Sequence, residues 1–141
     1  MRIVLDTVIL VRGLLDPFGW SGTLLFDRTG AYEWVVCPEI VAEYLDVIRR
    51  SNLAEKFRTI AGRDLDAVLD RIGTATLVFP TQIPAVCRDP ADDKFLAAAM
   101  TGSAQFIVSE DMDLLDLGSY EGIAIVTSSR FLPTLQNPRN T

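Results

Sequence analysis

Carboxylates are the side chains in this sequence whose types and spacing could carry out chemistry. Asp89, Asp92 and Asp93 fall within five positions, immediately before an apolar stretch. Two more, Asp111 and Asp113, follow a short apolar run farther along the chain. Carboxylate oxygens are the hard ligands that Mg²⁺ and Mn²⁺ prefer. If the fold gathers these groups, the sequence predicts a site for a divalent metal ion.

The composition excludes several other kinds of site. The chain contains no histidine, which removes histidine general bases, Ser-His-Asp triads and histidine-ligated zinc. Cys37 and Cys87 match no metal-binding or redox spacing, so we expect reduced, part-buried thiols, with a disulfide as the less favoured alternative. The net charge of −6 argues against a general polyanion-binding protein, although it is compatible with a local basic patch.

Length and hydropathy indicate one compact domain. The chain has 141 residues, of which 49% are hydrophobic, and this is enough to bury a core. We place the domain at residues 1–136 and a polar tail at 137–141. No apolar run approaches the length of a membrane span, and Asp6 brings a charge too early for a signal peptide. We therefore expect a cytoplasmic protein that does not contact membranes.

The elements that must position the carboxylates alternate between short strands and helices. We expect strands at 2–5, 32–36, 75–79, 106–108 and 123–126. We expect helices at 8–15, 21–28, from Pro38 to Ile48, two between 51 and 73, and others at 90–100, 114–117 and 128–135. This alternation predicts an α/β sandwich around a mostly parallel sheet.

In such sheets, ligands bind beyond the carboxyl ends of the strands, and four segments bring acids there. Asp6 follows the first strand, Glu43 lies in the helix after the second, Asp111 and Asp113 follow the strand at 106–108, and the cluster at 89–93 opens the preceding helix. Close carboxylates repel each other by about 4 kcal/mol per pair at an effective dielectric of about 20. A divalent cation reverses that repulsion, and such a site fits metal-assisted phosphodiester hydrolysis.

Each acid also has a structural explanation. Asp89, directly before a proline, is typical of a helix N-cap. Asp92 falls at the capping-box position, and Asp93 lies in the first turn, where the helix dipole favours negative charge. Asp6 could cap the first helix, and Glu43 could be a solvated residue at the edge of an apolar stripe.

Four segments carry a family resemblance: Val-Leu-Asp-Thr at 4–7, Pro-Glu-Ile-Val-Ala-Glu-Tyr at 38–44, Cys-Arg-Asp-Pro-Ala-Asp-Asp-Lys-Phe-Leu-Ala at 87–97, and Asp-Met-Asp-Leu-Leu at 111–115. With them the sequence resembles PIN-domain proteins of the branch described as toxins of toxin–antitoxin systems, related to VapC-type ribonucleases. The resemblance implies a three-layer α/β/α sandwich with a five-stranded sheet, one or two Mg²⁺ or Mn²⁺ ions, and hydrolysis of RNA. It also implies a homodimer and a cognate antitoxin protein.

By position, the resemblance implies four core acids, Asp6, Glu43, Asp93 and Asp111, with Asp113 as a supporting fifth. Asp93 is preferred over its neighbour at 92 because Asp-Lys-Phe-Leu-Ala-Ala-Ala matches the family's pattern of an acid followed by an apolar helix. Our hypothesis is that Asp6, Asp93 and Asp111 hold the metal with support from Asp113, while Glu43 ligates it or orients the attacking water. Supporting residues would be Thr7, Asp92 and Ser109, and those that receive phosphates would be Arg12, Arg88 and Lys94.

Two residues depart from the family pattern. Val8 stands where an asparagine usually follows Asp-Thr, and Glu110 adds a negative charge where many relatives have glycine. The alternative function is therefore a degenerate PIN domain that binds RNA or a protein without cleavage. A phosphatase or receiver domain fits less well, and no Gly-x-Gly-x-x-Gly follows the first strand. Phe18, Trp20 and Trp34 are candidates for an apolar contact surface, although core packing better explains Trp34.

Overall fold

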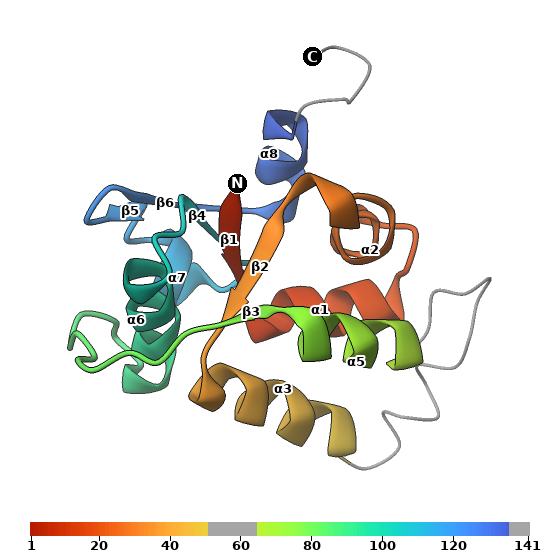
Figure 1. Cartoon of the computed structure of the whole chain (residues 1–141). Coiled ribbons are helices and arrows are strands. Elements are labelled where there is room, and N and C mark those ends of the chain that lie inside the picture. Colours follow the sequence, from red (N-terminus) through yellow and green to blue (C-terminus); the bar gives the residue numbers. More distant parts are fainter. Residues whose placement is uncertain (51–64, 136–141) are drawn as a thin grey trace.

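A six-stranded sheet forms the centre of the protein (Figure 1). The computed structural model describes residues 1–50 and 65–135. The strands are β1 (Arg2–Leu5), β2 (Glu33–Val36), β3 (Thr76–Leu77), β4 (Phe106–Val108), β5 (Ser119–Tyr120) and β6 (Ile123–Val126). Their order is β3-β2-β1-β4-β6-β5, and only the β5–β6 pair is antiparallel. The expected mostly parallel sheet is confirmed, but the expected count of five strands is wrong because β5 adds a short sixth strand at one edge.

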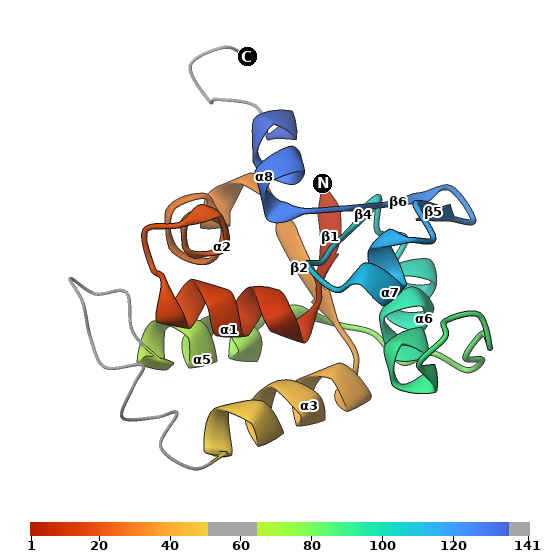
Figure 2. The same ribbon diagram turned by 180° about the vertical axis from the view of Figure 1, so that it is seen from behind.

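Helices flank this sheet on both faces. The helices are α1 (Thr7–Leu15), α2 (Trp20–Gly22), α3 (Pro38–Arg49), α5 (Leu65–Thr74), α6 (Asp93–Thr101), α7 (Met112–Leu115) and α8 (Ser128–Phe131). Figures 1 and 2 show α1, α2 and α5 on one side of strands β1 and β2, with α6 on the other side. No helix within the described ranges is long and apolar enough to cross a membrane.

Several element boundaries differ from those expected. The helix expected at 21–28 is the short α2 followed by a π-helical segment, Thr23–Asp27. The helix expected at 90–100 starts with a 3₁₀ turn, Pro90–Asp92, and continues as α6. The helix expected at 114–117 is α7, which starts earlier because Asp111 caps it. Most of the segment in which two helices are expected, residues 51–64, and the expected tail at 137–141 lie outside the described residues.

The central strands β1, β2 and β4 are buried along most of their length, as parallel strands covered on both faces must be. Ile3, Val4 and Leu5 of β1 are fully buried. Trp34 of β2 is also buried, which confirms that it packs in the core. The two cysteines are free thiols, as expected, with Cys37 buried.

Strand register brings the first acid to the edge of the sheet. Leu5 of β1 is paired with Val108 of β4. The backbone N–H of Asp6 donates to the carbonyl of Val108 at 2.9 Å, so the next residues, Asp6 and Ser109, are neighbours just beyond the strands. The buried Tyr44, in the middle of α3, donates its hydroxyl hydrogen to the carbonyl of Leu5, which holds α3 beside the same edge.

Candidate metal centre

Three aspartates form a compact group beyond the carboxyl ends of the strands. Asp92, Asp111 and Asp113 each offer a carboxylate oxygen, and these atoms all lie within 4.8 Å of one another. Asp92 ends the 3₁₀ turn that precedes α6, whereas Asp111 is the N-cap of α7 and accepts the backbone N–H of Asp113 at 3.0 Å. Two short helical starts therefore aim carboxylates at one point.

Asp6 is joined to this group through one buried hydroxyl. The Oγ of Ser109 donates to Oδ2 of Asp6 at 2.5 Å and accepts the backbone N–H of Asp111 at 2.9 Å. Burial raises the pKa of Asp6, and the charges of Asp111 and Glu43 raise it further, while hydrogen bonds from Ser109 and the Val8 backbone oppose the rise. Ser109 thus contacts both Asp6 and Asp111, the position that a residue supporting the acids would occupy.

We expect Ser109→Ala to destabilise the protein by about 1–3 kcal/mol, because it leaves a carboxylate oxygen of Asp6 and the N–H of Asp111 without their buried partner. Urea unfolding, followed by circular dichroism, measures the change. Ser129→Ala is the matched control, since Ser129 is exposed and we expect its removal to change the free energy of unfolding by less than about 0.5 kcal/mol. Equal stabilities of the two variants would contradict this role of Ser109.

Asp92 has a buried carboxylate oxygen without a partner in the described part of the chain, a feature that a metal ligand would show in the absence of its metal. The residue is 9% exposed, and its Oδ2 is buried without a hydrogen-bond partner among the described residues. Burial, followed by the charges of Asp111 and Asp6, raises its pKa to about 7. A buried oxygen of this kind costs folding free energy unless a cation or donor meets it.

The donor set fits a hard divalent cation. All three clustered residues offer carboxylate oxygens, which suit Mg²⁺ or Mn²⁺, and no nitrogen or sulfur ligand joins them within the described ranges. Cys87 lies close by, but burial and the neighbouring carboxylate of Asp93 raise its pKa to about 12, so it remains a neutral thiol.

Asp93 has a different contact from the one expected. Its Oδ1 accepts the backbone N–H groups of Val86 at 3.1 Å and Cys87 at 2.8 Å. Burial alone would raise the pKa of Asp93, but these hydrogen bonds outweigh it and lower the pKa. The sequence places Asp93 among the ligands and Asp92 beside them, whereas the structure groups them the other way round. Successive side chains of a 3₁₀ turn point about 120° apart, so neighbours face different surroundings.

Glu43 lies near Asp6 but outside the compact group of three. Its carboxylate accepts the hydroxyl hydrogen of Thr7 and forms an ion pair with Lys94, whose Nζ lies 2.8 Å from Oε1. The side chain of Lys94 is only 13% exposed and lies over the ring of Phe95. Lys94 is therefore paired with an acid of the site, and its expected contact with a phosphate stays a prediction. The sequence contains no local signal for this pair, because its members come from α3 and α6.

The two arginines lie at the rim and are also paired. Nε of Arg88 lies 3.3 Å from a carboxylate oxygen of Asp113, and Arg88 also pairs with Asp116. Nη1 of Arg12 lies 4.0 Å from Oε2 of Glu110. Both arginine side chains are largely exposed, so a phosphate could still approach them.

Glu110 does not point into the acidic group. Its Oε1 accepts the backbone N–H of Ser128 at 3.1 Å and the hydroxyl hydrogen of Ser128 at 2.8 Å. The charge that the sequence places at the mouth of the site is thus directed toward the start of α8.

One comparison with known proteins, at the level of the protein family, agrees with this arrangement. Comparisons with individual curated proteins and with solved structures found no match. The family profile described as PIN domain matches residues 2–113, a range that includes every acid of the centre. The match covers most of the sequence and the geometry agrees with it, so the chain belongs to the PIN domain family, whose members are generally nucleases.

Proposed function

We propose that this protein is a metal-dependent endoribonuclease and acts as the toxin of a toxin–antitoxin pair. The observation that carries the enzymatic proposal is the buried, unpartnered Oδ2 of Asp92 beside the carboxylates of Asp111 and Asp113. Three close carboxylates oppose folding unless a cation neutralises them, so their convergence favours a metal-binding role over a structural one. Family membership supports the nuclease class.

In the proposed reaction, Asp92, Asp111 and Asp113 would hold Mg²⁺ or Mn²⁺, with Asp6 beside them. Bound there, the ion would lower the pKa of an attacking water and neutralise charge on the phosphate. Ser109 keeps Asp6 and Asp111 in a fixed relation. A water molecule that attacks the phosphate would be oriented by Glu43, whose own carboxylate is held in place by Thr7 and Lys94.

A cleavage assay on an RNA pool, with Mg²⁺, with Mn²⁺ or with EDTA, tests this function. We expect wild-type cleavage only with metal, and loss of cleavage in Asp6→Asn and Asp111→Asn. Asp116→Asn is the matched control, because Asp116 lies nearby, is paired with Arg88 and stands outside the acidic group. Metal-independent cleavage, or equal cleavage by all four proteins, would refute the proposal.

A second candidate function is a PIN domain that binds RNA or a protein partner without cutting. Val8 favours this function because it offers Asp6 only its backbone N–H, at 3.4 Å. The ion pair between Lys94 and Glu43 also favours it, because the charge of Glu43 is balanced by Lys94 rather than by a metal ion. Mn²⁺ binding without cleavage of any RNA would support it, whereas appearance of cleavage in Val8→Asn would show an attenuated ribonuclease. The homodimer and the antitoxin belong to the proposal through the family resemblance, and size-exclusion chromatography tests the dimer.

A further inference from the structure

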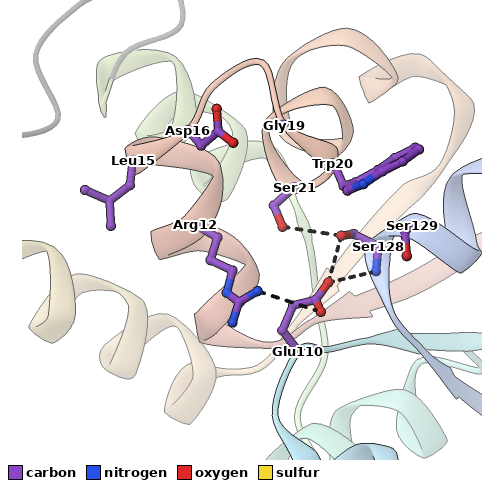
Figure 3. A pocket seen from close by; sticks show the side chains of 9 residues that line it. All are labelled: Arg12, Leu15, Asp16, Gly19, Trp20, Ser21, Glu110, Ser128 and Ser129. Carbon is purple, nitrogen blue, oxygen red and sulfur yellow. Dashed lines mark hydrogen bonds and ion pairs between the residues drawn. The ribbon is translucent and has the colours of Figure 1, made fainter.

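A pocket of about 280 Å³ lies beyond Glu110, next to the acidic centre (Figure 3). It is lined by α1, by the turn that leads into α2 and the start of that helix, by Glu110, and by the start of α8. Two of its lining residues connect it directly to the metal centre. Glu110 immediately precedes Asp111, and Arg12 lies on α1, the helix that Asp6 caps.

The pocket combines a flat aromatic face with a cation and a hydrogen-bond acceptor. Trp20 is 60% exposed and lines the pocket together with Ser128 and Ser129. Ser128 holds Oε1 of Glu110, so Oε2 is the oxygen that faces Arg12, at 4.0 Å. At that distance the ion pair is loose, and both groups remain available to a ligand.

These three features match an unpaired nucleotide. Single-stranded RNA offers flat bases that stack on aromatic side chains, base edges with N–H donors, and phosphates that attract arginine. A structural role accounts less well for Trp20, because a core tryptophan would be buried, as Trp34 is at 4% exposure.

We propose that this pocket receives an unstacked base of single-stranded RNA adjacent to the phosphate at the acidic centre. Trp20 stacks on the base, Oε2 of Glu110 accepts an N–H from its edge, and Arg12 contacts a neighbouring phosphate. The inference rests on the proposed ribonuclease function, and it assigns that function a base-binding subsite.

Binding measured in EDTA, where no metal-dependent cleavage occurs, tests the subsite separately from catalysis. The probe is a fluorescein-labelled single-stranded RNA of mixed sequence, followed by anisotropy. We expect Trp20→Ala to weaken binding by about 5- to 100-fold, the range that base–aromatic stacking supports, and Trp20→Phe to retain most of the affinity. Phe79→Ala is the matched control, since Phe79 is an aromatic residue of similar exposure that does not line the pocket.

Intrinsic fluorescence gives a second readout, because the chain has two tryptophans and only Trp20 is exposed. Unlabelled RNA should quench the emission of wild-type protein but not that of Trp20→Ala. A matched oligonucleotide with abasic sites in place of every base should bind wild type and Trp20→Ala equally, because no base is present to stack.

The outcomes separate the subsite from the catalytic proposal. Equal binding of the mixed-sequence RNA by wild type and Trp20→Ala would overturn the subsite, even if the protein cleaves RNA. A loss of affinity in Trp20→Ala together with no cleavage by metal-loaded wild type would support the subsite and refute the ribonuclease. A Trp20→Ala effect of the same size on the abasic oligonucleotide would also overturn the subsite.

Discussion

Asp92→Asn should abolish metal-dependent cleavage and, at the same time, raise the thermal stability of the metal-free protein at pH 8. The substitution removes a ligand, so we expect a loss of about 100-fold or more in cleavage rate. It also removes a buried charge whose Oδ2 has no partner among the described residues. Relief of that penalty should stabilise the metal-free fold by about 1–2 kcal/mol, or a melting temperature higher by about 3–8 °C.

The neighbouring substitution Asp93→Asn is the matched control, with the opposite expectation. Asp93 accepts two backbone N–H groups, from Val86 and Cys87, and a neutral amide accepts them less strongly than a carboxylate does. We expect a loss of about 1 kcal/mol in stability but an unchanged rise in melting temperature on addition of Mn²⁺. Thermal melts of both variants, with and without Mn²⁺, decide between the two residues. A metal response that survives in Asp92→Asn and disappears in Asp93→Asn would contradict the grouping seen in the structure.

The metal-free protein should become less stable as the pH rises from about 4 to about 7. Burial and the charges of Asp111 and Asp6 raise the pKa of Asp92 from 3.8 to about 7 in the folded state. The folded protein therefore binds more protons than the unfolded chain in this interval, and the stability conferred by the protonated carboxyl is lost as the pH passes through the folded pKa. A shift of this size corresponds to at most about 4 kcal/mol, and solvent screening at the open side reduces it to about 2 kcal/mol.

Two other acids shape the same curve. Asp6 also has a raised pKa, so it adds to the decline. Asp93 has a lowered pKa, so its contribution is present above about pH 4 and is lost below it. Urea unfolding at intervals from pH 4 to pH 8 measures the profile, and Asp92→Asn should flatten it.

Added Mn²⁺ should reverse this trend. The ion binds the ionised carboxylates of the folded protein, so its stabilising effect grows as the pH rises. A metal-free stability that increases between pH 4.5 and pH 7 would contradict the raised pKa of Asp92, as would a metal effect that is independent of pH.

The general location of the site follows from the sequence because parallel strands place their carboxyl ends at one edge. Asp6 directly follows the buried strand β1, and Asp111 lies three residues after the end of β4. In the structure the two are joined through Ser109. The strands at 2–5, 106–108 and 123–126 agree with the sequence pattern because each is an apolar run, apart from the exposed Arg2 at the start of the first. The strand β5 consists of two residues and is too short to produce any periodic pattern.

The finer assignments depend on geometry that periodicity does not contain. The choice between Asp92 and Asp93 rests on a 3₁₀ turn at Pro90–Asp92, where the sequence suggests a regular helix start. These two neighbouring side chains point in different directions. The carboxylate of Asp92 faces Asp111 and Asp113, whereas that of Asp93 accepts the backbone N–H groups of residues 86 and 87. The Lys94–Glu43 pair likewise requires the relative placement of two helices, which is a property of the packed fold.

The hydroxyl of Ser109 is oriented by the charge of Asp6. The backbone N–H of Asp111 can only donate, so Ser109 Oγ accepts it, and an ionised Asp6 can only accept, so the hydroxyl hydrogen points to its Oδ2. A hydroxyl oxygen has a second lone pair, so a proton taken up on Oδ2 of Asp6 would be able to donate back to Ser109. The direction of this short hydrogen-bonded chain therefore depends on the ionisation of Asp6, and a cation that keeps Asp6 ionised would keep the Ser109 hydroxyl in one orientation.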